Sequence, residues 1–179
     1  MKIKQSALLL GLLILLPIIS HGKSAQEINI LADATLTKFK QEVTGGEQFL
    51  QQAAGVLVFP QVLKAGLGVG GEYGEGVLRE GGQNSAYYST ASASFGLQAG
   101  AQSKAVVIVF LQPAALNKFK QTKGWKAGVD GSVAIIKWGV GEDINTMNFK
   151  EPIVGFVFGN KGLMFNLTLE GSKITRISR

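Results

Sequence analysis

Apolar residues recur at helical spacing in the segment that follows residue 24. Between Ala25 and Val43 they fall three and four positions apart, which predicts an amphipathic helix. Gly45 and Gly46 are expected to end this helix, and a second, shorter helix is predicted over Glu47–Ala54. Each helix presents one apolar face, so both are expected to pack against another layer of structure.

A period of two replaces the helical period in the next segment. The apolar run Val56–Phe59 predicts a short strand that stops at Pro60. Beyond it, the even positions are occupied by glycine: Gly66, Gly68, Gly70, Gly74 and Gly76. This period predicts a strand. One of its faces would carry almost no side chains, so another backbone, a helix or a ligand could approach it closely.

The middle of the chain predicts two further strands and a helix. Residues 91–102 alternate between apolar odd and polar even positions, which predicts a strand with one buried face. Ala105–Leu111 is continuously apolar and predicts a central strand covered on both sides. Pro113 is expected to open a short helix over Ala114–Gln121.

The C-terminal third again predicts strands. Gly128–Ile136 alternates, and the apolar segments Ile153–Phe158 and Leu163–Leu169 flank Gly159–Gly162, which predicts a hairpin. We therefore expect an α+β fold, in which a largely antiparallel sheet curls toward a barrel and the N-terminal helices pack on it.

The first 22 residues have the pattern of an export signal. A basic start is followed by the apolar run Ala7–Ile19, which is shorter than the roughly 20 residues of a membrane span and typical of a signal-peptide core. The small residues Ser20 and Gly22 predict cleavage after Gly22. We expect residues 1–22 to be a signal peptide and residues 23–179 to be one domain exported to a periplasm. The alternative is an uncleaved membrane anchor.

Composition excludes several kinds of chemistry. The chain has 24 glycines in 179 residues, no cysteine, and a single histidine, His21, in the expected signal peptide. Without these side chains the mature domain cannot form a Ser-His-Asp or Cys-His site, an ordinary zinc site or a disulfide. Removing the leader lowers the net charge from +6 to +4, because two lysines and no acids are lost. This mild bias favours anionic surfaces but falls short of a nucleic-acid binder.

A glycine-rich motif and a single acidic residue are candidate sites. Gly66–Gly71 matches the dinucleotide pattern G-x-G-x-x-G, but the glycines continue in strand period and no acid follows about 20 residues later. Asp130 lies between Val129 and Gly131 in a predicted strand and is interpreted as a hydrogen-bonded structural acid, with a functional role as the alternative. We expect no enzyme, no cofactor and no metal site.

One stretch combines lysines with aromatic residues. Between residues 118 and 126 the chain carries Lys118, Lys120, Lys123 and Lys126 together with Phe119 and Trp125. This pattern is typical of a membrane interface, where lysines contact phosphate head groups and Trp lies at the acyl boundary. The alternative is a solvated connection with Trp125 packed inward.

Several blocks resemble the SYLF-domain family, whose lipid-binding domain also occurs in yeast actin regulators. They lie within about residues 47–174: residues 54–56, 58–66, 68–78, 96–102, 128–134, 161–163 and 169–172. The resemblance implies binding to phospholipid, with Lys64 as a head-group contact. It departs at Ile135–Trp138 and at Phe165–Asn166, where relatives carry small residues, so the local pocket or surface is expected to differ.

Two functional hypotheses follow. The first is an exported, non-catalytic protein that binds an anionic phospholipid membrane. The second is an envelope interaction protein that docks a partner chain on its glycine-lined strand. Actin is not expected as a partner of an exported protein.

Overall fold

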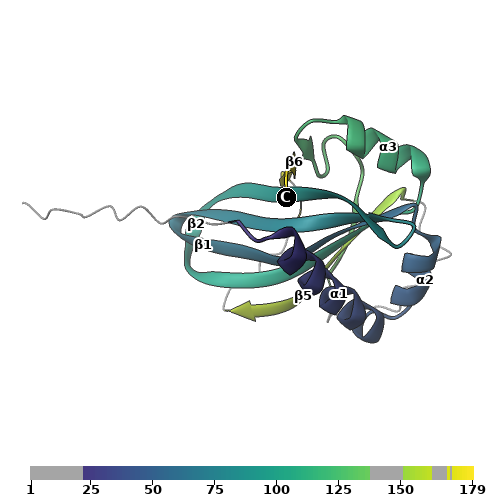
Figure 1. Cartoon of the computed structure of the whole chain (residues 1–179). Helices are drawn as coiled ribbons and strands as arrows, with labels where there is room; N and C mark the ends of the chain where they lie inside the picture. Colours follow the sequence, from purple (N-terminus) through teal and green to yellow (C-terminus); the bar gives the residue numbers. More distant parts are fainter. Residues whose placement is uncertain (1–21, 138–150, 163–168, 170) are drawn as a thin grey trace, which may run out of the picture.

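The computed structural model describes residues 22–137, 151–162, 169 and 171–179 (Figure 1). The elements in this part are α1 (Ala25–Glu42), α2 (Gly46–Gln52), β1 (Gly55–Glu80), β2 (Gln83–Phe110), α3 (Pro113–Gln121), β3 (Trp125–Lys126), β4 (Ala134–Lys137), β5 (Ile153–Gly162) and β6 (Lys173–Ile177). The predicted α+β class is confirmed, with a curled and largely antiparallel sheet and the N-terminal helices packed on it.

The sheet is organised around one long hairpin. β1 and β2 pair antiparallel along their whole lengths, from Gly55 opposite Phe110 to Glu80 opposite Gln83. Gly81 and Gly82, both with positive φ, form the two-residue turn that matches the twist of such hairpins. On its other edge β2 pairs first with β6 and then with β5. The strand order is β3-β6-β2-β5-β4, and the β4–β5 pair is parallel.

The hairpin curls so far that β1 approaches itself. A Cβ atom at Gly74 would lie 2.8 Å from the carbonyl oxygen of Gln61, and one at Gly76 would overlap the carbonyl oxygen of Val58. Glycine is therefore required where the two halves of β1 cross. Figure 1 shows the resulting arch of β1 and β2, which extends away from the helices.

Two apolar layers form on the two faces of the curled sheet. The inner layer lies within the curl and is closed by α3, and includes Leu57, Phe59, Leu78, Ile108, Phe110, Phe119 and Trp125. The outer layer lies between the sheet and α1 and α2, and includes Ile28, Phe39, Phe49, Val58, Val107, Val109 and Phe156. Because alternate residues of β2 enter different layers, the prediction that Ala105–Leu111 is a central strand covered on both sides is confirmed.

The helices begin and end close to the predicted positions. Ser24 caps α1 by accepting a hydrogen bond from the Glu27 amide, and Pro113 opens α3. An ion pair of 2.7 Å between Arg79 and Asp33 ties the exposed side of α1 to the end of β1. Each helix therefore packs through the apolar face that its sequence pattern predicts.

Three predicted boundaries are wrong. Pro60 does not end a strand, because β1 continues through it with a shift in register between Phe59 and Val62, where the missing amide donor is tolerated. Residues 128–133 lie between β3 and β4 and are not a strand. Gly159–Gly162 belongs to β5 and is not a turn, while Leu163–Thr168 of the predicted second arm lies outside the described residues.

The buried face of residues 91–102 is the polar one at the described positions. Ala91, Ala93 and Ala101 are exposed, whereas Gln102 is buried and Ser92 is partly buried. The sequence alternation therefore predicts the strand but does not show which face points inward. The physical reason lies in a group of charged residues inside the curl, described below.

Candidate functional site

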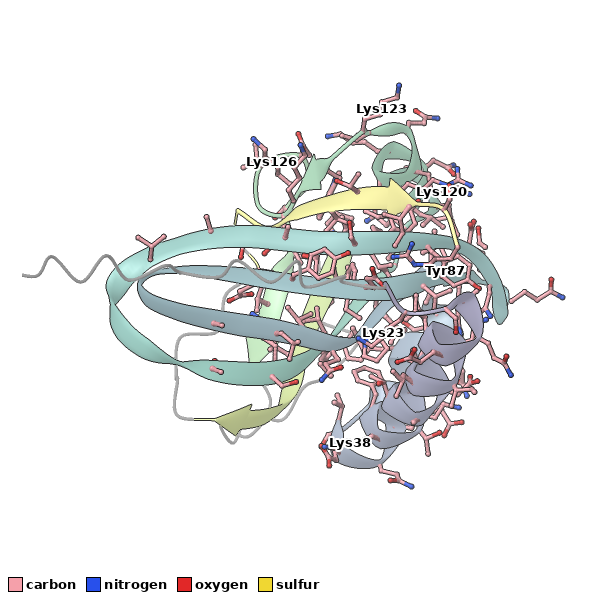
Figure 2. All side chains as sticks on the ribbon, turned by 60° about the vertical axis from the view of Figure 1, so that its left-hand side comes forward. Lys23, Lys38, Tyr87, Lys120, Lys123 and Lys126 are labelled. Carbon is pink, nitrogen blue, oxygen red and sulfur yellow. The ribbon has the colours of Figure 1, made fainter. Side chains whose placement is uncertain are left out.

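An exposed basic surface forms where α3, β3 and β6 meet. Leu116 and Phe119 anchor α3 in the inner layer, which leaves the lysines on the rest of the helix in solvent. Gly124, with φ of 66°, then turns the chain into β3. We define the basic surface as Lys118, Lys120, Lys123, Lys126 and Lys173, all of which are exposed. Figure 2 shows Lys120, Lys123 and Lys126 on the side of the molecule opposite Lys38 of α1.

Lys173 belongs to this surface because β3 pairs with β6. It lies outside the lysine-rich segment 118–126 from which the sequence predicts the site. β3 and β6 pair antiparallel, with Lys126 directly opposite Lys173 and Trp125 opposite Ile174. The two apolar side chains enter the core, so the two lysines project outward as a like-charged cross-strand pair. Such a pair is destabilising, and this cost favours a functional reason for the concentration of charge.

Two of the predicted site residues take positions that limit their role. Trp125 is 1% exposed and packs edge-on against Phe119, at 5.4 Å between ring centroids. It adopts the inward-packed alternative and is not available as an interfacial anchor in this conformation. Lys120 is exposed but forms an ion pair of 2.9 Å with Glu80, and hydrogen bonds from Ser85 and Lys120 lower the pKa of Glu80.

Lys64 is not at the surface. It is 6% exposed, and its ammonium lies 3.4 Å from one carboxylate oxygen of Glu72, while Lys104 lies 2.7 Å from the other. These three residues, which we call the interior charge cluster, come from both halves of β1 and from β2. A head-group contact by Lys64, as the family resemblance implies, does not match this buried position.

Gln102 extends the interior charge cluster. It lies opposite Lys64 in the β1–β2 register and is 3% exposed. The interior of the curl therefore changes from apolar near α3 to polar toward the arch. This change accounts for the inward orientation of the polar face of β2.

Part of the glycine-lined face of β1 lies against the chain itself. Cβ atoms at Gly66, Gly74 and Gly76 would meet the backbone of Gly70, Gln61 and Val58, respectively. The close approach expected from the glycine pattern is therefore real at these positions, but it is intramolecular. At these three positions no surface is left for the partner chain of the docking hypothesis. The surroundings of Gly68 are not among the described features.

Asp130 holds a turn. Its carboxylate accepts a 2.7 Å hydrogen bond from the Lys126 amide, and its own amide donates to the Lys126 carbonyl. The interpretation as a hydrogen-bonded structural acid fits this geometry, although the residue lies in a turn and not in a strand. The turn also exposes Val129, 74% of whose surface is accessible beside Lys126.

A second buried carboxylate, Glu75, gathers donors from distant parts of the chain. It is 4% exposed, and it accepts hydrogen bonds from the Tyr73 hydroxyl at 2.8 Å, the Lys23 amide at 2.9 Å and the Arg179 guanidinium. Burial by itself would raise the pKa of Glu75. The three hydrogen bonds and the charge of Arg179 outweigh this effect and hold the pKa below its ordinary value near 4.5.

This lowered pKa predicts a pH-dependent contribution to stability. We expect Glu75→Gln to reduce the free energy of unfolding at pH 7. Because the folded-state pKa of Glu75 lies below the unfolded-state value, the contribution is complete above about pH 4.5 and is lost as the pH falls through the folded-state pKa. Urea unfolding of both proteins between pH 3 and pH 7 measures it. A difference that persists unchanged at the lowest pH would contradict the prediction.

Two features are absent from residues 22–137, 151–162, 169 and 171–179. No helix in this part of the chain is long and apolar enough to cross a membrane. Across the same residues, no group of three or more metal-ligating side chains lies close enough together to hold an ion.

The protein is an α+β domain built on a curled, largely antiparallel sheet, and it carries an exposed basic surface. Comparison with protein families matches residues 91–178, about half of the chain, to the Ysc84 family, described as "Las17-binding protein actin regulator". This part of the chain belongs to that family, which is the SYLF family that the sequence blocks indicate. SYLF domains are known in the context of lipid binding and actin regulation. A search of curated proteins found no match.

Proposed function

We propose that this protein is a non-catalytic module that binds anionic phospholipid at a membrane surface of the cell envelope. The observation that carries the proposal is the basic surface on α3, β3 and β6. Among the described residues, Lys118, Lys123, Lys126 and Lys173 form no ion pair with an acid. Membership of a family with a lipid-binding context supports the same conclusion.

Charge alone supplies modest affinity. A basic residue near an anionic surface contributes about 1 kcal/mol, so four lysines give roughly 4 kcal/mol, which corresponds to a Kd of about 1 mM. An apolar contact is needed to strengthen binding. Since Trp125 is buried, the side chain best placed to provide it is Val129, which is exposed in the turn that follows Lys126. Burying a valine side chain adds about 1.5 kcal/mol.

Location is part of the proposal. A signal peptide over residues 1–22 would deliver the domain to a periplasm, where the lipid head groups of the envelope are the available anionic surface. Residues 1–21 lie outside the described residues, and the support for export is the sequence pattern.

Vesicle co-sedimentation tests the binding surface. We expect binding to vesicles of phosphatidylglycerol and phosphatidylcholine, and little binding to phosphatidylcholine alone. Replacing Lys126 and Lys173 together with Gln removes about 2 kcal/mol and should weaken binding about 30-fold. Raising the salt from 0.1 M to 1 M shortens the screening length from about 10 Å to about 3 Å and should also weaken it.

The chain offers a matched control. Lys38 and Lys40 are both exposed on α1, and Figure 2 shows Lys38 on the side of the molecule away from the basic surface. Replacing both with Gln removes the same charge. This control should bind nearly as well as the unmodified protein. Equal losses for the two double variants would show that only net charge matters. Equal binding to neutral and anionic vesicles would reject the proposal.

A single apolar variant separates the two contributions. Val129→Ser should weaken binding to anionic vesicles about tenfold and leave the slope of the salt dependence unchanged, because no charge is removed. A variant that binds as well as the original would show that the turn does not enter the membrane interface.

A further inference from the structure

The surroundings of Glu75 point to a role for the predicted cleavage site. The Lys23 amide nitrogen, which donates to Glu75, belongs to the first residue after the bond that the signal-peptide pattern predicts to be cut. Figure 2 places Lys23 at the start of α1, beside the curled sheet. Cleavage would convert this neutral amide into an α-ammonium at the same position.

We propose that Glu75 is a binding site for the α-ammonium of Lys23, formed when the leader is removed after Gly22. The hydrogen bond of 2.9 Å from the Lys23 nitrogen to Glu75 Oε2 becomes an ion pair. The site is otherwise complete, because the Tyr73 hydroxyl and the Arg179 guanidinium both contact the other oxygen, Oε1. An ammonium carries three donors where the amide carries one, and a charge-assisted hydrogen bond is roughly twice as strong as a neutral one.

The surroundings of Gly22 support the proposal independently. A Cβ at residue 22 would overlap the Arg179 guanidinium and would lie 2.9 Å from Glu75 Oε1. Both neighbours are the ends of flexible side chains, so a larger residue at position 22 would have to displace the Arg179 guanidinium from Glu75. Glycine is also one of the small residues that a signal-peptide cleavage site requires.

After processing, Glu75 would join the segment before α1 to the segment after β6. β1 supplies Glu75, Lys23 lies two residues before α1 and supplies the ammonium, and Arg179 lies two residues after β6. Lys23 lies 52 residues before Glu75 in the sequence, and Arg179 lies 104 residues after it. The processed form is therefore expected to be more stable than the same chain with a residue left in front of Lys23.

A chain extended by one glycine tests this. The protein processed to begin at Lys23 is compared with one that begins at Gly22, which has the same terminal charge displaced by one residue. Each is prepared with Glu75 and with Glu75→Gln. We expect Glu75→Gln to raise the unfolding equilibrium constant at least fivefold more in the chain beginning at Lys23 than in the chain beginning at Gly22. Equal effects in the two chains would overturn the proposal.

Two further measurements keep the test independent of how well the Gln variant folds. Titration of the α-amino group by NMR should give a pKa above the ordinary range of about 7.7–8.0 in the chain that begins at Lys23, and an ordinary pKa in the chain that begins at Gly22. N-terminal sequencing of the full-length chain after export should begin at Lys23. An ordinary pKa in both chains, or a different first residue, would overturn the proposal without bearing on lipid binding.

Discussion

Replacing Glu72 with Gln is expected to destabilise the protein by about 3–5 kcal/mol, measured as the free energy of unfolding in urea. Glu72 is 9% exposed and its two carboxylate oxygens contact the ammonium groups of Lys64 and Lys104, which are also buried. Removing one member of a buried ion pair leaves its partner charge without that compensation, at a cost of this size. The substitution keeps the shape of the side chain and changes only its charge.

A surface pair provides the matched control for this expectation. Lys38 and Glu42 lie 3.6 Å apart on α1, and both side chains are more than one-third exposed. Glu42→Gln removes the same charge and should cost at most about 1 kcal/mol, because exposed ion pairs contribute little. Similar small losses for both variants would show that the interior charge cluster is not important for the curl. A large loss for Glu72→Gln alone would show that it is.

Gly76→Ala is expected to destabilise the fold by about 1–3 kcal/mol or more. The added methyl group would overlap the carbonyl oxygen of Val58, which belongs to the opposite half of β1. The neighbour is backbone and not the end of a flexible side chain, so the two halves of the strand would have to separate. Overpacking of a close contact typically costs this amount.

Gly71→Ala is the control for the effect of glycine itself. The nearest atom to a Cβ at this position is the Ser92 carbonyl oxygen at 3.7 Å, which is an ordinary contact. Alanine restricts the unfolded chain, so this variant should be neutral or more stable by up to about 1 kcal/mol. Opposite signs for the two variants in the same unfolding experiment would support the self-crossing of β1. Equal effects would contradict it.

The basic surface was only partly predictable. The four lysines between residues 118 and 126 are adjacent in sequence, so a local pattern was enough to find them. Lys173 is brought beside Lys126 by the β3–β6 pairing, which joins segments almost 50 residues apart. Whether Trp125 points outward or inward depends on what lies beneath it, and the structure places it against Phe119 in the inner layer.

For Lys64, too, one property was readable from the sequence and another depended on the tertiary structure. Its place in a block that resembles the SYLF family was readable from the sequence, but its position in a strand was not, because the strand was predicted to stop at Pro60. Its burial was not, because its partner carboxylate comes from Glu72 on the returning half of the strand and its second neighbour, Lys104, comes from β2. A lone lysine in an alternating pattern gives no sign of an ion pair across a curl.

The sequence by itself determined the helices, the strand periods, the α+β class and the family, because these depend on local spacing and on the order of short blocks. The tertiary structure alone decided which face of each strand is buried, since both faces of a curled hairpin can meet another layer. It also decided that Gly74 and Gly76 lie against the other half of β1, and that Glu75 meets Lys23 and Arg179. Contacts of this kind depend on the curvature of the whole sheet, which no local pattern specifies.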